Sequence, residues 1–528
     1  MKRDEGLLKS AGIISAAVAV SRITGLLRES VFSWLFGAGA EFDAYVLGYR
    51  IPNLARDLFA EGALSSAFVP TFTRYLTTKT RDEARELSNV TSTLLLAIVG
   101  ILVALGMLFT PAFVEIFASG FHAVPGKFEL AVELVRIMFP FLLFVALAAQ
   151  AQGILNASHQ FGIPALSSSL FNVGSIVFGL AIGWLIDSPI RGMAYGMLCG
   201  GAAQLCFQLP SIWRAGFSWR PRWNLRHEGV QAILRLMGPA VLGVASVQIN
   251  VLVNTNFAAS LPGNGAVSWL AYAYRFQQLP MGLFGIAIAS ATLPRISRSA
   301  AGGDLTQFRE TFSRSLVMIL LLTIPSAAGL AVLGESMIAL VYQHGRFQPF
   351  DTHQTAVALS CYAVGLASFA SLKLIAPAFY ALGDAKTPML VSMLSIAVNF
   401  VTAFTMLRVF SIGHAGLALS LSLVSVFNSV VLLELMRRRI GGIHSGHIAS
   451  GLLKILLAAV PMAGVCFAVR LTSHRLLGGG HSAHLFNVLV GIPAGALAFY
   501  LTASALRIPE LTDTRKAFLQ KLGIRSVC

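Results

Sequence analysis

The chain has 528 residues, of which 56% are hydrophobic and only 12% are charged, and its mean hydropathy is +0.73. This composition excludes a soluble globular protein and predicts a protein that crosses a membrane several times. Only helices and closed barrels satisfy their backbone in lipid, and the apolar runs are long rather than alternating, so we predict an all-α polytopic fold. The net charge of +16 would suit a nucleic-acid-binding protein, but its distribution along the chain does not.

Apolar runs of membrane-spanning length, about 20 residues each, follow one another along the chain, and we predict about fourteen transmembrane helices. No small-residue cleavage site follows the first run, so we expect it to be retained as a helix rather than removed as a signal peptide. The runs are centred near residues 22, 58, 100, 143, 175, 202, 245, 280, 322, 365, 398, 425, 460 and 495.

The basic residues gather on one side of the predicted membrane. With an even number of spans both termini share that side, and the positive-inside rule makes it cytoplasmic. The opposite loops hold only Lys127, Arg191, Arg346, Arg408, Arg470 and Arg475. The positive charge therefore sets orientation and can rest on anionic membrane lipids, and we predict no nucleic-acid partner. On the basic side, Trp213, Trp219 and Trp223 alternate with arginines in a pattern typical of an interfacial belt.

Charged residues interrupt the first two runs and the eighth. A charge at the bilayer centre costs about 2.5–3.5 kcal/mol on insertion scales, so such residues must face a polar cavity or each other. The basic residues are Arg22, Arg28, Arg50, Arg56 and Arg275, and the acidic residues are Glu29, Asp43, Asp57 and Glu61. The carboxylates can hold arginines as structural bridges or as gating charges. Because five arginines face four carboxylates, the surplus predicts an anionic cargo in a central cationic cavity.

The second run carries most of this chemistry. On a helical wheel, Asp43, Arg50, Asp57 and Glu61 fall within about 40° of one another and form one polar stripe. Arg56 lies off the stripe, but Pro52 should kink or break the helix between them. In the first run, Arg22 and Glu29 share a face at a spacing of seven, with Arg28 beside them. Guanidinium groups bind phosphate oxygens in a bidentate manner, so a pyrophosphate would suit this set of arginines.

An internal repeat divides the chain. The segment ALSSAFVPTFTRY (63–75) is similar to AIASATLPRISRS (287–299), and QGILNASHQFGIPAL (152–166) is similar to APAFYALGDAKTPML (376–390), both at an offset of 224 residues. Tyr49-Arg50 and Tyr274-Arg275 match at 225. We therefore predict two parallel six-helix lobes, over 1–228 and 229–440, which rock around the cavity. The last two helices and a cytoplasmic tail occupy 441–528.

Several segments resemble the MurJ/MviN family of lipid II flippases. They include SRITGLLRES (21–30), PNLARDLFAEGALSSAFVP (52–70), MGPAVLGVASVQINVLVNTNFA (237–258) and VSWLAYAYRFQQLPMGLFGIAIASATLP (267–294). The resemblance covers nearly the whole chain in order. It implies fourteen helices in the fold of multidrug and polysaccharide-lipid exporters, and the transfer of lipid II, an undecaprenyl-pyrophosphate-linked peptidoglycan precursor, from the inner to the outer leaflet of the bacterial cytoplasmic membrane by alternating access.

The resemblance also implies roles for individual residues. Arg22, Arg28, Arg56 and Arg275 match the family's essential cavity arginines, and Asp43 matches its acidic residue at the start of the second helix. Arg50 stands where some relatives have lysine. The family's flippases are carriers rather than enzymes and need no cofactor. Cell-wall synthesis proteins are further partners that this implies.

Other positions depart from the family pattern or leave alternatives open. Glu29, Asp57 and Tyr274 stand where relatives often have aspartate, arginine and an acidic residue, respectively. Some relatives place a sodium-binding carboxylate in the second lobe, but no Asp or Glu occurs in 236–260 or 387–409, so we predict no metal site. Neutral oxygen ligands for sodium remain an alternative, from Asn250, Asn254 and Asn399. Membrane potential is an alternative driving force. The alternative functions are export of another polyprenyl-linked oligosaccharide, small-molecule export by the same fold, or a membrane enzyme acting on polyprenyl-linked sugars.

Overall fold

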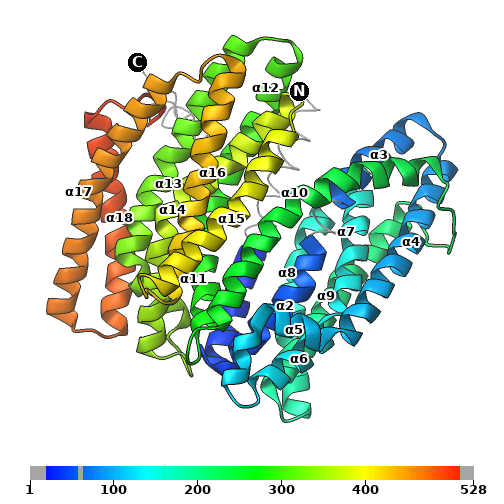
Figure 1. Cartoon of the computed structure of the whole chain (residues 1–528), viewed down its shortest axis with the longest axis horizontal. Coiled ribbons are helices and arrows are strands. Elements are labelled where there is room, and N and C mark those ends of the chain that lie inside the picture. Colours follow the sequence, from blue (N-terminus) through cyan, green and yellow to red (C-terminus); the bar gives the residue numbers. More distant parts are fainter. Residues whose placement is uncertain (1–19, 58–63, 159, 512–528) are drawn as a thin grey trace. The chain divides into compact units, whose positions relative to one another are not determined.

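The computed structural model describes residues 20–57, 64–158 and 160–511, and these residues form helices and connecting turns without a strand (Figure 1). The predicted all-α polytopic fold is confirmed. Ten helical rods in this part of the chain are long and apolar enough to cross a membrane. The prediction of fourteen spans stays a prediction, and the centre of the second run, residue 58, lies outside the described residues.

The chain packs as two compact units, the first ending at Ser268 and the second beginning at Trp269. The first unit starts with a helix over residues 20–36. It continues with α2 (Ala40–Ala55), α3 (Ser65–Thr78), α4 (Arg81–Leu108), α5 (Thr110–Ala118), the 3-10 helix η2 (Ser119–Ala123), α6 (Lys127–Met138), α7 (Phe141–Ala157), α8 (Gly162–Leu185), α9 (Pro189–Arg214) and α10 (Glu228–Ala259). The first turn of α11 (Ala266–Pro280) closes this unit.

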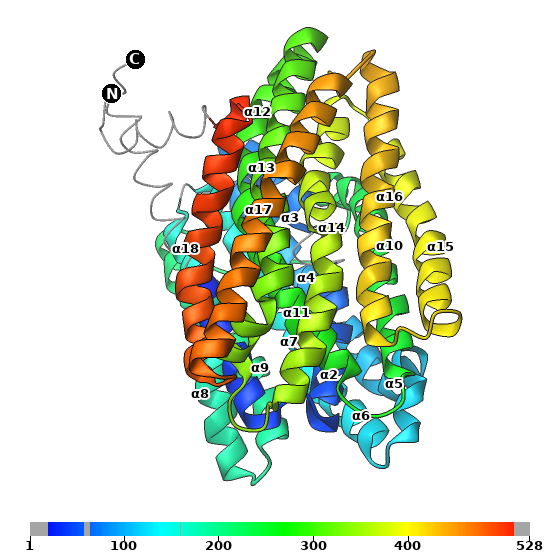
Figure 2. The ribbon, with the colours of Figure 1, turned by 90° about the vertical axis from the view of Figure 1, so that its left-hand side faces the viewer.

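The second unit contains the rest of α11 and the helices that follow it. They are the π-helical turn η3 (Met281–Ile286), α12 (Ala287–Ala301), α13 (Leu305–Tyr342), α14 (Pro349–Ala381), α15 (Lys386–Arg408), α16 (His414–Ile440), α17 (Ser445–Leu477) and α18 (His481–Ala505). The last two helices run side by side against α13 (Figure 2), joined by a core that includes Val317, Leu333, Ile455, Cys466 and Phe499.

Each unit contains residues in the π conformation between two α-helices. After α2, residues 56, 57 and 64 adopt the π conformation, and α3 follows. After α11, the same conformation begins at Met281, 225 residues after Arg56, and α12 follows. Pro52 neither ends nor breaks α2, which continues to Ala55. The wider π conformation begins just beyond Pro52, and its two occurrences are separated by the offset of the predicted repeat.

Helices α8 and α9 make the closest helix pair of the first unit. Gly179 and Gly183 of α8 face Gly192 and Gly196 of α9, and a Cβ at Gly192 would overlap the backbone of Gly183. The two backbones therefore touch along this face, a packing that only residues without a side chain permit.

The predicted lobe boundary at residue 228 rests on the internal repeat, and the packing boundary does not test it. Helix α10 follows that residue and packs on α3, α4 and α5 within the first unit. A helix can belong to one repeat by sequence while it packs on the other. The predicted divisions, including the appendage over 441–528, stay predictions.

Candidate functional site

The helix over residues 20–36 presents Arg22 to a cavity. Arg22 is exposed and lines this cavity together with Gln152 and Asn156 of α7 and Ser168 of α8. The side chain of Asn172 donates from Nδ2 to the Ser21 carbonyl oxygen at 3.2 Å and to Thr24 Oγ1 at 3.3 Å, which holds the helix against α8. Arg22 is therefore placed where a guanidinium meets neutral amides and hydroxyls.

Arg28 and Glu29 lie buried two turns further along the same helix. Arg28 donates to Glu29 Oε1 at 3.0 Å, and its guanidinium carbon lies 5.4 Å from the centre of the Phe171 ring. Arg28 Nε has no hydrogen-bond partner. The sequence placed Arg22 and Glu29 on one face with Arg28 beside them, and the structure pairs Glu29 with Arg28. The buried arginine thus keeps one donor for a further acceptor.

Arg56 and Asp57 form a second pair of neighbours, at the π turn after α2. Arg56 donates from Nε and a terminal nitrogen to Asp57 Oδ1 at 3.2 and 3.0 Å. The other carboxylate oxygen accepts from Gln248 of α10 at 2.9 Å and from Asn53 at 3.4 Å. Both members of the pair are half-buried, so the ion pair remains open to water or to an anion.

A second contact joins α2 to α10. Arg50 of α2 donates to Thr255 Oγ1 of α10 at 2.5 Å. Arg50 precedes Asp57 by seven residues, whereas Thr255 follows Gln248 by seven. The two contacts show that these helices run antiparallel here. Helix α10 thus supplies neutral polar partners to two members of the predicted stripe.

Asp43 is the most buried member of the stripe, and its partner is a lysine rather than an arginine. Its Oδ2 accepts from Lys127 Nζ at 2.8 Å, and the two side chains are only 2% and 3% exposed. The lysine also donates to Asn264 Oδ1 at 3.0 Å and lies 4.3 Å from the centre of the Phe121 ring. A buried ion pair needs such extra partners to offset its desolvation.

The same carboxylate accepts at the first turn of α11. Gly265 N donates to Asp43 Oδ2 at 2.8 Å, and the backbone N–H and hydroxyl of Ser268 donate to Oδ1 at 2.9 and 2.5 Å. Free N–H groups at a helix start favour a negative charge. Asp43 therefore holds α2, α6 and the end of the first unit in one hydrogen-bonded cluster.

Two predicted residues remain, Arg275 and Glu61. Arg275 is half-buried on α11 in the second unit, beside Tyr274, whose ring packs at 5.8 Å on Tyr362. Glu61 lies outside the described residues. Within the described ranges, no group of three or more His, Cys, Asp or Glu side chains is placed to hold a metal ion.

The sequence did not identify Lys127, Gln248, Thr255 or Ser268 as partners of the charged residues. Lys127 was assigned to an outer loop, but it is the first residue of α6. A cation is disfavoured at a helix N-terminus, so a lysine there is a weak signal that a carboxylate lies nearby. The other three residues carry no such signal, because a helical pattern does not reveal which neighbouring helix lies opposite.

The fold defines a helical membrane protein of a known transporter architecture. An inward-facing multidrug transporter of the MATE family and the MOP superfamily matches 82% of this chain and 98% of its own with a TM-score of 0.66, although only 17% of residues are identical. A structure described as "Lipid II flippase MurJ, inward closed conformation" matches 96% of this chain and 99% of its own, with a TM-score of 0.76 and 26% identity.

Comparison with known sequences gives the particular family. The family model "Lipid II flippase MurJ" matches residues 32–489. A "Probable lipid II flippase MurJ" of Vibrio cholerae is 36% identical over 81% of this chain and 82% of its own. Another of that description, from Bdellovibrio bacteriovorus, is 33% identical over 97% of both chains. The chain belongs to the MurJ lipid II flippase family.

Proposed function

We propose that this protein transfers lipid II from the cytoplasmic to the outer leaflet of the bacterial inner membrane by alternating access. The family match over residues 32–489 carries this conclusion. The charged clusters support it, because arginines in an otherwise apolar chain are suited to the pyrophosphate that links the polyprenyl chain to the sugar-peptide head group.

In this proposal, the arginines bind the pyrophosphate by exchanging partners. Arg22 faces a polar cavity and makes no ion pair within the described chain. Arg28 lies against Glu29 and Arg56 against Asp57, and an arriving pyrophosphate would compete with these carboxylates for the arginine donors. Because the pairs are built from adjacent residues, an arginine can turn to the substrate without moving its helix. Arg50 and Arg275 complete the proposed set.

The carboxylates would act as gating or positioning charges. Asp43 holds three segments together through Lys127, Gly265 and Ser268, so releasing it would loosen that end of the first unit. Asp57 would link the movement of α2 to α10 through Gln248. Glu61 belongs to this group by its place on the predicted stripe.

As a carrier, the protein would make and break no covalent bond. Both of its termini would lie in the cytoplasm. This carrier would need no cofactor. The membrane potential can drive the transport, since it supplies about 2.3 kcal/mol per charge per 100 mV. Cell-wall synthesis proteins that supply or consume lipid II are its expected partners.

The test is complementation of bacteria depleted of their own flippase, combined with an assay of lipid II accessible at the outer surface. Wild type should restore growth and surface lipid II, and Arg22→Ala, Arg28→Ala, Arg56→Ala and Arg275→Ala should each fail at matched expression. The control is Arg475→Ala, which removes an exposed arginine outside the proposed site.

The results test the identity of the transported lipid and the role of the arginines separately. If a well-expressed wild type restores neither growth nor surface lipid II but transfers another lipid-linked oligosaccharide, the cargo would be that oligosaccharide. Full activity of the four alanine variants would show that the arginines are structural.

A further inference from the structure

The segment that joins α9 to α10, residues 215–227, lies along α4 and is called the strap here. Its backbone is fixed at two points one helical turn apart, where Arg220 N donates to Asn89 Oδ1 at 3.0 Å and Arg222 N to Thr93 Oγ1 at 3.1 Å. At its start, Arg85 Nε donates to the Gly216 carbonyl at 2.8 Å. The strap is therefore held against the helix bundle rather than projecting from it.

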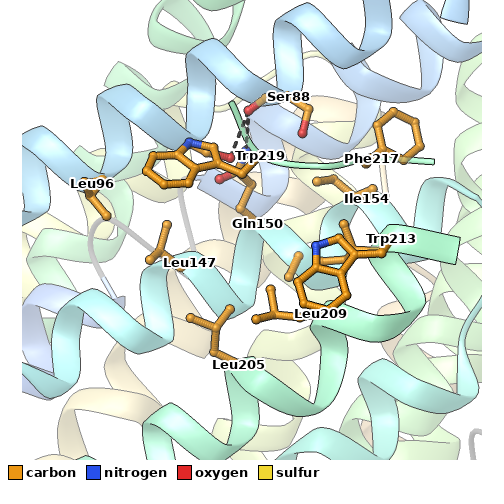
Figure 3. A pocket seen from close by; sticks show the side chains of 13 residues that line it. Ser88, Leu96, Leu147, Gln150, Ile154, Leu205, Leu209, Trp213, Phe217 and Trp219 are labelled. Carbon is orange, nitrogen blue, oxygen red and sulfur yellow. Dashed lines mark hydrogen bonds between the residues drawn. The ribbon is translucent and has the colours of Figure 1, made fainter. Parts of the chain in front are cut away.

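A cavity lies beneath the start of the strap, between α4, α7 and α9 (Figure 3). Its walls are largely apolar, and one polar contact lies among them, where Gln150 Nε2 donates to the Ser88 carbonyl at 3.1 Å. The rings of Trp213 and Trp219 border the cavity and are 60% and 52% exposed. The apolar walls include Leu96, Leu147, Ile154, Leu205 and Leu209.

The cavity follows the direction of α4 into the membrane. From Ser88 to Leu96, both of which line it, α4 rises about 12 Å. Helix α4 begins at Arg81, on the side that the positive-inside rule predicts to be cytoplasmic. Tryptophans favour the head-group level of a bilayer, so the exposed rings mark the mouth and the leucines lie at the depth of the acyl chains.

The mouth carries an excess of positive charge. The segment 213–226 holds four arginines, and no acidic residue occurs between Asp187 and Glu228. Arg222 lies 3.8 Å from Glu86 of α4. Within the described chain, Arg214 and Arg220 form no ion pair, and each directly follows a tryptophan that lines the cavity. Their exposed guanidinium groups can therefore donate hydrogen bonds to a phosphate.

We infer that the strap and its cavity bind one anionic phospholipid of the leaflet on the basic side. Arg214 and Arg220 bind the head-group phosphate and its negative charge, the two tryptophans pack at the level of the glycerol backbone, and one acyl chain occupies the cavity. The site lies outside the charged clusters of residues 20–36 and α2, and the inference does not depend on the identity of the transported lipid.

The test is a titration of the purified full-length protein with phosphatidylglycerol and with phosphatidylcholine of the same chains, read by native mass spectrometry. Wild type should bind phosphatidylglycerol more tightly. Arg214→Gln combined with Arg220→Gln should lower that affinity about thirtyfold, the equivalent of about 1 kcal/mol for each arginine near an anionic head group. Arg214→Lys with Arg220→Lys keeps the charge and should retain most of the affinity.

A second variant tests the cavity itself. Leu209→Trp fills it and should lower the affinity for phosphatidylglycerol at least tenfold, while Leu457→Trp, at an exposed position on α17, should not. The charge-matched control is Arg295→Gln with Arg298→Gln, two exposed arginines of α12.

One readout needs no cavity-filling substitution. Phosphatidylglycerol with brominated chains should quench the tryptophan fluorescence of wild type more than that of Trp213→Phe with Trp219→Phe. Equal binding of the two lipids by wild type, unchanged binding by the glutamine variant, or equal quenching in both proteins would each overturn the proposal.

Discussion

The rods α2–α3 and α11–η3–α12 share a backbone plan but differ in charge. In both, a π turn follows the first helix at equivalent positions, and a proline, Pro70 or Pro294, lies inside the helix after it. Between residues 43 and 61 the first rod carries five charged side chains, whereas Arg275 is the single charge between 266 and 294. The two segments thus share the positions of the π conformation and of the proline, and they differ in their charges.

Two pairs of equivalent residues make the comparison concrete. Arg50 and Arg275, 225 residues apart, keep the same charge. Asp43 and Ser268 are separated by the same offset, and here a serine replaces the aspartate and donates two hydrogen bonds to it. In this pair Asp43 supplies the acceptor and Ser268 supplies the donors.

The largest expected effect comes from breaking the Asp43–Lys127 pair. Asp43→Asn leaves a lysine that is 3% exposed without its counter-charge, and such a change costs about 3–5 kcal/mol. Thermal unfolding in detergent should show this loss. Adding Lys127→Met to Asp43→Asn should recover much of it. The control is Glu133→Gln, which breaks an exposed pair with Arg191 and should cost less than about 1 kcal/mol. A stable Asp43→Asn single variant would contradict this account.

A smaller effect is expected from glycines in the two rods. A Cβ at Gly285, in η3, would lie 2.9 Å from Ala370 Cβ and 3.0 Å from its Cα, so Gly285→Ala should destabilise by about 1–3 kcal/mol. Gly48→Ala in α2 should cost less, because its nearest atom, 3.0 Å away, is the flexible end of Met138. If unfolding temperatures rank the two variants the other way, η3 is not fixed by its contact with α14.

The contact between Arg50 and Thr255 should contribute about 1 kcal/mol, the usual net value of a hydrogen bond. Thr255→Val keeps the shape of the side chain and removes the hydroxyl that accepts from Arg50. Thr402→Val in α15 is the matched control, because that hydroxyl donates only within its own helix. Equal loss of unfolding free energy in both variants would show that the hydrogen bond from Arg50 to Thr255 contributes no net stability.

The smallest effect concerns the turn between α14 and α15, where Asp384 stands in place of Gln160 of the first repeat. Burial would raise the pKa of Asp384, but hydrogen bonds from the N–H and hydroxyl of Thr387 and the charge of Arg439 outweigh it and lower the pKa below its usual 3.8. Stability from this carboxylate is therefore full above about pH 4 and is lost as the pH falls through the lowered value.

Unfolding temperatures of wild type and Asp384→Asn, measured from pH 7 to pH 3, check this. Wild type should lose its advantage over the variant at the acid end. A constant difference between the two proteins across this range would rule out the carboxylate as its source.

The sequence predicted the parts of this structure that depend on local pattern. Apolar runs located the helical rods, and charges within them located Arg22, Arg28 and Asp43. It did not say which arginine each carboxylate holds, since a wheel describes direction around one helix and not the reach of an adjacent side chain. It also missed Lys127 and Thr255, because contacts between distant helices depend on packing that no local pattern encodes.

The strap shows a further limit of the same kind. Its tryptophans and arginines identified an interfacial segment. Its attachment to Asn89 and Thr93, however, depends on a long-range fit.

The glycine contact between α8 and α9 has a mechanical consequence. Where two backbones touch, neither helix can slide along or rotate against the other without collision, so the hairpin behaves as one stiff beam. The two helices should therefore move together as a rigid body. We therefore expect bending of the first unit to concentrate at the π turn after α2, beside Arg56 and Asp57, rather than in this hairpin.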